Sequence, residues 1–151
     1  MRTFEDVPAF CAAVGEHLGD GSWVTIDQDR INVFADATDD HQWIHVDPER
    51  AARGPFGSTI AHGFLTLSLV PVMMAEVFEV KNLALVVNYG SDKVRFLRPV
   101  PVDSQVQASV TLAAIEEIDM GVRATIHVEV RLADGGRPAC VAEMITVLVP
   151  A

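Results

Sequence analysis

Four titratable side chains stand close together in the segment ATDDHQWIHVDPER, residues 37–50. Asp39 and Asp40 are adjacent, and His41 and His45 follow. Imidazole and carboxylate groups are weak bases in bulk water, but in an enclosed site each can take up or release a proton near pH 7. Two such groups, Asp40 and His45, can hold one water molecule from two sides and activate it. The segment is therefore a candidate for acid–base chemistry on water.

A metal site is the first alternative for this segment. If one helix ran through it, His41 and His45 would share a face at i and i+4 with Asp40 beside them, which is a metal-binding spacing. The Asp47–Pro48 pair argues against that helix, because it is typical of a new helix start. No third strong ligand recurs nearby at metal spacing. We therefore predict a loop over residues 38–46 and no metal.

Ordinary surface and packing roles are the second alternative. We expect Asp39 and His41 to be solvated loop residues, and Trp43 and Ile44 to be packing residues. Asp47 is accounted for as a helix cap. Spacing by itself leaves both a catalytic and a structural role open for Asp40 and His45.

Length and composition limit the protein to a few broad classes. Its 151 residues are 50% apolar and 21% charged, which predicts one folded domain over residues 1–151. The net charge is −10, so we expect neither nucleic acid nor an anionic membrane as a partner. The two cysteines are too far apart in sequence to indicate a disulfide framework. The N-terminus lacks the apolar core of a signal peptide, which predicts a cytoplasmic protein.

The most apolar stretch, Ile60–Phe78, predicts a long helix. It is apolar around most of its circumference, which suits either a bilayer or the middle of a protein core. Pro71 and Glu76 inside it and His62 near its start favour the core. We expect a buried central helix rather than a membrane span.

Shorter elements precede that helix. Thr3 is a candidate N-cap with Asp6 in the capping-box position. Asp27 is a candidate cap for an amphipathic helix, and Pro48 suits the first position of another. The signals predict, in order, a helix over residues 3–19, a strand over 23–26, a helix over 28–38 and a helix over 48–53.

From Asn82 onward apolar residues recur with a period of two, which predicts antiparallel strands with one buried face. Residues 105–112 and 122–131 alternate in this way, and ADGG at 133–136 predicts a hairpin turn. The segment 139–149 is apolar on both faces, so we expect it in the middle of the sheet. The pattern predicts an α+β fold. In it, a curved antiparallel sheet of about five strands, a meander of four plus an early one, wraps around the long helix.

Two longer runs carry a family resemblance. They are FADATDDHQWIHVDPERAARGPFGSTIAHGFLTLSL at residues 34–69 and NYGSDKVRFLRPVPV at residues 88–102. In this order they resemble the MaoC-type (R)-specific enoyl-CoA hydratases, in particular the small single-domain actinobacterial enoyl hydratases. The resemblance implies the hot dog fold, a homodimer and reversible (R)-specific hydration of a trans-2-enoyl-CoA. It implies no metal and no cofactor beyond the coenzyme A of the substrate.

The resemblance also implies roles for particular residues. Asp40 and His45 match the family's catalytic aspartate and histidine, which hold the reacting water. His62 and Gly63 match the histidine–glycine pair that opens the central helix, and the Gly63 amide is implied to bind the thioester oxygen. The other residues expected to contact the substrate are Gln42, Asn88, Tyr89, Lys93 and Arg95, of which Asn88, Tyr89 and Lys93 are candidates for lining the partner's site. Alternation places Lys93 and Arg95 on one face of a strand. That face could contact the phosphates of coenzyme A, or it could simply be a solvated outer face.

Three positions depart from the common family pattern. Asp39 stands where the family usually has glycine, and Gln42 and Trp43 replace an asparagine and a proline. These changes leave the catalytic pair intact and bear on loop geometry and substrate range.

Two other functions stay open at this point. A hot dog acyl-CoA thioesterase shares the fold and substrate class but generally relies on a carboxylate on or near the central helix. Here that helix offers only Glu76, near its far end. A non-catalytic acyl-CoA binding subunit needs no catalytic pair at all.

Overall fold

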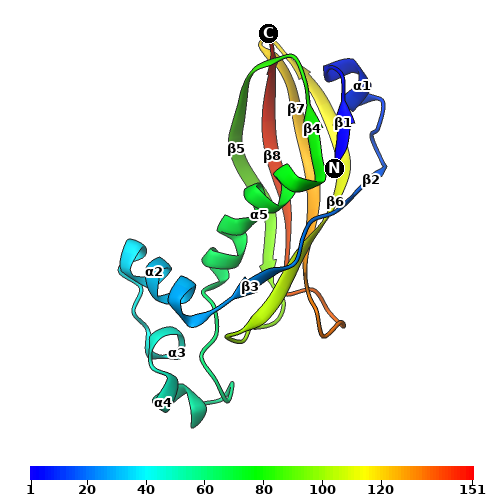
Figure 1. The fold of residues 1–151 in the computed structure, drawn as a ribbon. Helices are drawn as coiled ribbons and strands as arrows, with labels where there is room; N and C mark the ends of the chain where they lie inside the picture. The colour runs from blue at the N-terminus through cyan, green and yellow to red at the C-terminus, as the bar shows by residue number, and fades with distance from the viewer.

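A curved antiparallel sheet and one long helix form the body of the protein (Figure 1). The computed structural model describes residues 1–151. In chain order the elements are β1 (Arg2–Phe4), α1 (Val7–Cys11), β2 (His17–Asp20), β3 (Val24–Ile26), α2 (Gln28–Thr38), α3 (Trp43–Val46), α4 (Pro48–Ala52), α5 (Gly63–Val77), β4 (Phe78–Val80), β5 (Leu83–Phe96), β6 (Ser104–Ile118), β7 (Gly121–Leu132) and β8 (Cys140–Pro150). Helix α5 lies against the sheet, whereas α2, α3 and α4 extend beyond one end of it (Figure 1).

The large sheet has the strand order β2-β6-β7-β8-β5, and β3 also pairs with β6. Strands β1 and β4 form a separate parallel pair. Strand β8 therefore lies inside the sheet, as its apolar sequence predicted. The expected four-strand meander is wrong in one respect, because β5 pairs with β8 and not with β6. Alternation identifies strands but not their neighbours, and an interior place for β8 buries a strand that is apolar on both faces.

Strand β7 shows how the period of two builds the core. Its buried residues alternate along the strand: Val122, Ala124, Ile126, Val128 and Val130. They belong to a cluster of 29 buried residues that also includes much of α5. The predicted turn after β7 is confirmed, since Gly135 and Gly136 there have φ of +79° and +80°, which favours glycine.

Helix α5 is the buried central helix that the sequence predicted, with bounds Gly63–Val77. Val70 and Met73 are at most 1% exposed, and the helix packs on β6, β7 and β8. Pro71 lies on the exposed side. No helix in the structure combines the length and the apolarity that a membrane span requires.

The N-terminal helix expected over residues 3–19 is wrong. Strand β1, the short helix α1 and strand β2 occupy this range. Asp6, not Thr3, caps the helix, because its side chain accepts a hydrogen bond from the amide of Ala9 at 2.8 Å. Gly15 has a φ of +87°, a left-handed conformation that ends the helical turn, and β2 then pairs with β6.

Two predicted caps lie before the central helix. Asp27 accepts a hydrogen bond from the Arg30 amide at 2.8 Å and begins α2, and Asp47 accepts one from the Arg50 amide at 3.0 Å and begins α4. The expected loop over residues 38–46 is only partly confirmed, because its second half forms the single turn α3. Because His45 belongs to this turn, the turn determines which way its side chain points.

Candidate active site

Helix α3 carries His45 into the interior, where backbone contacts fix its ring. The residue is 7% exposed, and its Nδ1 lies 2.7 Å from the carbonyl oxygen of Ile60. The amide of Ile60 donates to the carbonyl of Ile44 at 3.0 Å, which holds the segment before α5 against α3. Gln28 of α2 donates from Nε2 to the carbonyl oxygen of His45 at 2.7 Å. These contacts hold the imidazole in one orientation.

The surroundings of His45 favour a neutral ring with one free nitrogen. Because the carbonyl of Ile60 can only accept a hydrogen bond, Nδ1 is assigned the proton and Nε2 keeps a lone pair. Burial lowers the pKa of His45 below its ordinary value of 6.5, and His62 acts in the same direction. The Ile60 carbonyl and the Asp40 carboxylate oppose this shift without reversing it. At neutral pH His45 is therefore an uncharged base.

A sharp turn between α2 and α3 presents Asp40 to His45. Asp39 ends α2 in the left-handed conformation, with φ of 58° and ψ of 19°. A carboxylate oxygen of Asp40 and a ring nitrogen of His45 lie within 4.8 Å of each other. A water molecule that makes ~2.8 Å hydrogen bonds to two groups at a tetrahedral angle holds them about 4.6 Å apart. This upper limit on the spacing of the pair is compatible with one shared water.

The fold brings a third titratable group, His62, to this pair. It is 3% exposed, and its ring stacks on the His45 ring with 3.8 Å between centroids and an interplanar angle of 24°. Asp40, His45 and His62 each offer a ligand atom, and these atoms all lie within 4.8 Å of one another. The expectation that no third metal-ligating group lies nearby is therefore wrong, because His62 is distant in sequence and close in space.

The stacking of the two imidazoles is a poor fit to a shared metal ion. The lone pairs of an imidazole lie in the ring plane, and two planes only 24° apart direct their lone pairs side by side. A zinc ion bound by both rings would instead need both nitrogens at about 2.0–2.1 Å, with their lone pairs aimed at one point. That the site works without a metal stays a prediction, which this geometry supports.

Gly63 brings the N-terminus of α5 to the same place. As the first residue of the helix, it carries one of the amides that a helix leaves without an intrahelical acceptor. A Cβ at this position would come within 2.9 Å of the Phe96 ring, so glycine is the residue that leaves the ring where it stands. The Gly63 amide can therefore act as a donor to a ligand oxygen.

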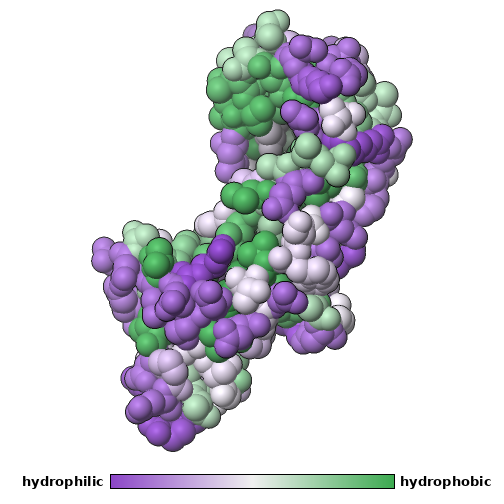
Figure 2. Space-filling model, viewed as in Figure 1, coloured by the Kyte–Doolittle hydropathy of each residue, from purple (hydrophilic) through white to green (hydrophobic).

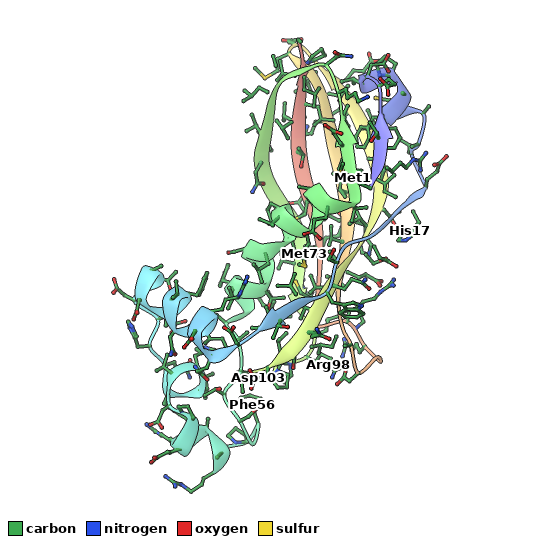
Figure 3. The ribbon with its side chains drawn as sticks, viewed as in Figure 1. Met1, His17, Phe56, Met73, Arg98 and Asp103 are labelled. Atoms are coloured by element: carbon green, nitrogen blue, oxygen red, sulfur yellow. The ribbon has the colours of Figure 1, made fainter.

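A cavity of about 360 Å³ lies beside these groups, and its wall includes His45 and Gly63 but neither Asp40 nor His62. Phe56 and Arg98 also line it, and Figure 3 places both toward the end of the sheet from which α3 and α4 extend. Arg98 is the only lysine or arginine in the wall, and Asp134 holds it at 2.6 Å. The cavity thus combines a base, a helix amide and a positive charge.

Known proteins are similar to this chain in sequence and in fold. The family profile described as MaoC like domain matches residues 9–133. The 3-hydroxyacyl-thioester dehydratase Z of Mycobacterium tuberculosis is 55% identical over 146 residues, which cover 96% of this chain and 97% of that protein. Nodulation protein N of Rhizobium leguminosarum bv. viciae is 43% identical, over 95% of this chain and 89% of its own length. The (R)-hydratase from A. caviae involved in PHA biosynthesis is 25% identical, with a TM-score of 0.73 over 88% of this chain and 96% of that chain.

The chain belongs to the MaoC-like domain family. The resemblance inferred from the sequence is confirmed, and with it the hot dog fold and the expectation of an enzyme of the hydro-lyase class. The family profile ends before β8, but the sequence relatives extend over nearly the whole chain.

Most other residues predicted to contact the substrate do not gather at this site of the MaoC-like protein. Asn88 lines a separate apolar cavity of about 540 Å³ beside the C-terminal half of α5. Tyr89 is 64% exposed on β5. Lys93 pairs with Glu143 at 2.8 Å, and Arg95 donates to a neighbouring backbone carbonyl. Within one chain these residues lie outside the wall of the site cavity.

The period of two from which Lys93 and Arg95 were assigned to one strand face is interrupted in β5. The pairing of β5 with β8 shifts register between Asp92 and Arg95, and Lys93 has a φ of +50°. A bulge inserts an extra residue and so breaks the period of two. The assignment of both cations to one strand face therefore loses its basis.

The exposed residues near Asp40 lie largely as predicted. Asp39 and His41 are exposed, and Trp43 is partly buried. Gln42 is exposed and begins α3, and its backbone amide faces the Asp40 carboxylate at 3.4 Å. Its side chain makes no capping hydrogen bond to α3.

Sequence patterns missed three features of this MaoC-like site. The carbonyl of Ile60 fixes the His45 tautomer, but a backbone group carries no signal in the residue type. His62 was expected to contact substrate, whereas its ring packs on His45. Nothing in the sequence around Arg98 indicated that this residue would enter the cavity wall.

Proposed function

We propose that this protein catalyses the reversible (R)-specific addition of water to a trans-2-enoyl-CoA, giving an (R)-3-hydroxyacyl-CoA. One observation carries the proposal: a buried neutral imidazole lies within 4.8 Å of a carboxylate, next to the N-terminus of α5. The M. tuberculosis relative is named a 3-hydroxyacyl-thioester dehydratase, and the A. caviae protein is named an (R)-hydratase. These names describe removal and addition of water, which are one reaction in opposite directions.

In the proposed reaction His45 and Asp40 share one water. Nε2 of His45 takes a proton from the water as the water oxygen adds to C3 of the enoyl group. Asp40 orients the same water and helps to pass the proton taken up by His45 on to C2, which returns His45 to its neutral form. One water is consumed for each double bond and no proton is left over, so the pair is ready for another turnover. The reverse steps remove water from the hydroxyacyl thioester.

Gly63 supplies the second part of the proposed mechanism. As water adds, negative charge develops on the thioester oxygen, which becomes enolate-like. An unpaired amide at a helix N-terminus stabilises such a charge because the donor is already oriented and the helix dipole favours an anion there. The proposed reaction needs no redox cofactor, and coenzyme A enters only as part of the substrate.

Local positive charge is needed to attract the phosphates of coenzyme A, because the protein has a net charge of −10. Arg98 is a candidate in the cavity wall, where its ion pair with Asp134 offsets part of its charge. Lys93 has a side chain that is 75% exposed and stays a candidate for phosphate contact together with Arg95. Gln42 is a candidate for contact with the thioester end of the substrate, because it is exposed beside Asp40.

A thioesterase is the chief competing function, and the position of Glu76 speaks against it. This carboxylate is in the last turns of α5, far along the helix from Gly63. It accepts a hydrogen bond from the amide of Ser22 at 3.0 Å, which gives it a structural use. The helix carries no other acidic residue that could attack or activate water at a thioester.

The deciding experiment uses crotonyl-CoA with two readouts on the same sample. Loss of enoyl absorbance reports hydration, and a thiol reagent reports release of free coenzyme A. We expect absorbance to fall while no thiol appears, and chiral analysis to identify the (R)-3-hydroxybutyryl product. Thiol release without hydration would establish the thioesterase, and binding with neither signal would establish an acyl-CoA binding subunit.

We also propose that the active form is a homodimer joined through β5. This strand is at the edge of the sheet, where unpaired backbone groups can accept a second strand. Its apolar side chains Leu85, Val86 and Tyr89 are 54%, 56% and 64% exposed. Figure 2 shows apolar surface at the upper left of the molecule, where β5 lies in Figure 1. Pairing of two such edges would carry Asn88 and Tyr89 of one copy toward the site of the other.

Light scattering at micromolar concentration tests the dimer. We expect twice the mass of one chain, and we expect Val86→Arg to reduce it toward one chain. Met120→Arg is the matched control, because Met120 is 60% exposed in the β6–β7 turn, which β8 separates from β5 in the strand order. A monomeric wild-type protein would contradict the proposal.

A further inference from the structure

His62 is placed to act on the catalytic pair rather than on the substrate. It is 3% exposed, so little of its ring can meet a ligand. It occupies the N-cap position of α5, yet its side chain makes no capping hydrogen bond. The imidazole turns instead toward the loop that carries Asp40.

One edge of the His62 ring holds the backbone at Asp40. Nε2 lies 2.9 Å from the carbonyl oxygen of Asp40, across 22 positions of sequence. A carbonyl can only accept, so Nε2 is assigned the proton and donates it. Nδ1 is buried and has no hydrogen-bond partner, so this nitrogen contributes no second anchor. The ring therefore makes a single directed hydrogen bond, to the residue whose carboxylate faces His45.

The face of the same ring fixes the plane of His45. The two rings stack at 3.8 Å between centroids, and the ring of Phe34 packs against His62 at 5.0 Å. His45 is otherwise held at its Nδ1 edge by the carbonyl of Ile60. A hydrogen bond at one edge still permits rotation about that bond, and a stacked neighbour restricts it.

We propose that His62 is a positioning residue that fixes Asp40 and His45 relative to the first turn of α5. The inference rests on the proposed function, in which these two residues activate the water and the Gly63 amide binds the thioester oxygen. Since His62 and Gly63 are adjacent, the residue that aligns the pair belongs to the same backbone turn as the oxyanion donor. The residues that activate the water and the amide that binds the thioester oxygen are then positioned by the same turn at the start of α5.

The electrostatic surroundings of His45 give this role a measurable signature. The titratable groups that face it are Asp40 from the preceding loop and His62 from α5. Arg98 shares the cavity wall but is paired with Asp134. Burial and the neighbouring His62 both lower the pKa of His45. Replacement of the His62 ring by a smaller uncharged group should therefore move the pKa of His45 upward.

Two substitutions separate the hydrogen bond from the stacking. His62→Gln keeps a donor that can reach the carbonyl of Asp40 but removes the ring, and His62→Phe keeps a ring but removes the donor. Phe34→Leu is the matched control, because it alters packing on His62 and leaves its hydrogen bond and its stacking on His45 in place. The measurements are kcat and KM for crotonyl-CoA over a pH series, the melting temperature, and NMR titration of the His45 imidazole without substrate.

We expect His62→Phe to lower kcat on the order of 10- to 100-fold with KM little changed, the usual range for loss of a group that orients a catalytic residue. His62→Gln should retain more kcat and should raise the pKa of His45, which moves the acidic limb of the kcat/KM profile to higher pH. Phe34→Leu should alter neither.

Two outcomes would overturn the positioning role. One is an increase in KM with unchanged kcat in either His62 variant, which would make His62 a substrate contact. The other is a His45 titration in His62→Gln identical to that of the wild type. If the wild-type protein fails to hydrate crotonyl-CoA, the proposed function fails, but the NMR titration still decides whether His62 controls His45. If His62→Phe melts far below the wild type, the glutamine variant carries the test.

Discussion

His41 and His45 are four positions apart in one segment, yet they stand in opposite surroundings. The His41 side chain is 49% exposed, and its Nε2 lies 2.8 Å from the carboxylate of Asp36. His45 is 7% exposed, and its Nδ1 meets a backbone carbonyl. The hydrogen bond with Asp36 raises the pKa of His41 above 6.5, whereas burial lowers the pKa of His45 below that value.

The difference shows that the direction in which a histidine side chain points, inward or toward solvent, decides whether it can act as a base. Asp39 turns the chain into the left-handed conformation at the end of α2, and α3 then points its histidine inward. An imidazole paired with a carboxylate on the surface tends to hold its proton. A buried neutral imidazole with a free nitrogen is ready to take one.

The largest effects are expected at the proposed catalytic pair, which joins the buried His45 to the exposed Asp40. Asp40→Asn and His45→Gln nearly preserve volume and hydrogen bonding, so the melting temperature should stay close to that of the wild type. Each should lower kcat by on the order of 10²- to 10⁴-fold, the usual range for loss of a positioned acid or base. Steady-state hydration of crotonyl-CoA measures this.

The double variant sharpens the assignment. Because both groups act on one water, Asp40→Asn combined with His45→Gln should be little worse than the poorer single variant. Independent, multiplying losses would mean that the two residues act on different steps. Near-normal activity in both single variants would remove the pair as the catalytic centre.

The next effect concerns Gly63, which carries the first amide of α5 and lines the same cavity as His45. Gly63→Val should lower hydration on the order of 10²- to 10³-fold, as for loss of an oxyanion donor, because a side chain there blocks close approach of the thioester. The added Cβ would also meet the Phe96 ring at about 2.9 Å. Gly63→Val combined with Phe96→Ala removes that clash. Recovery of activity in the double variant would assign the loss to Phe96 rather than to the blocked amide.

A pH titration compares the two histidines directly and without substrate. NMR of the imidazole protons should show His45 titrating below pH 6.5 and His41 above it. The ion pair of His41 with Asp36 stabilises the fold fully below pH 6.5 and is lost as pH rises through the raised pKa. Protonation of His45 has the opposite effect, so stability and hydration should both fall as pH drops from 6.5 through its lowered pKa. Coincident titrations would remove the contrast.

The smallest effects are expected at the exposed side. Asp39→Gly and His41→Ala should each leave kcat within about tenfold of the wild type, since both side chains are exposed and neither belongs to the proposed catalytic pair. Asp39→Gly should also leave the melting temperature unchanged or slightly raised, because glycine adopts the left-handed conformation without the cost that a Cβ imposes. A loss at His41→Ala as large as that at His45→Gln would mean that the wrong histidine has been chosen.

The sequence determined much of the fold through local signals. The alternation in β7, the glycines of the following turn and the caps Asp27 and Asp47 each act over a few residues and were predicted correctly. The helix expected over residues 3–19 was wrong because a left-handed glycine and pairing with β6 outweighed a helical pattern. The pairing of β5 with β8 was missed because strand order depends on partners distant in the chain.

At the site, the sequence by itself supplied the identities of Asp40, His45 and Gly63 and a family resemblance that carried their roles. Only the tertiary structure decided which side of the loop is buried, which ring nitrogen is free, and that His62 stacks on His45. The physical reason is that the pKa of an imidazole depends on its burial and on the groups around it. Those groups come from α2, α3 and the start of α5, and the fold alone brings them together.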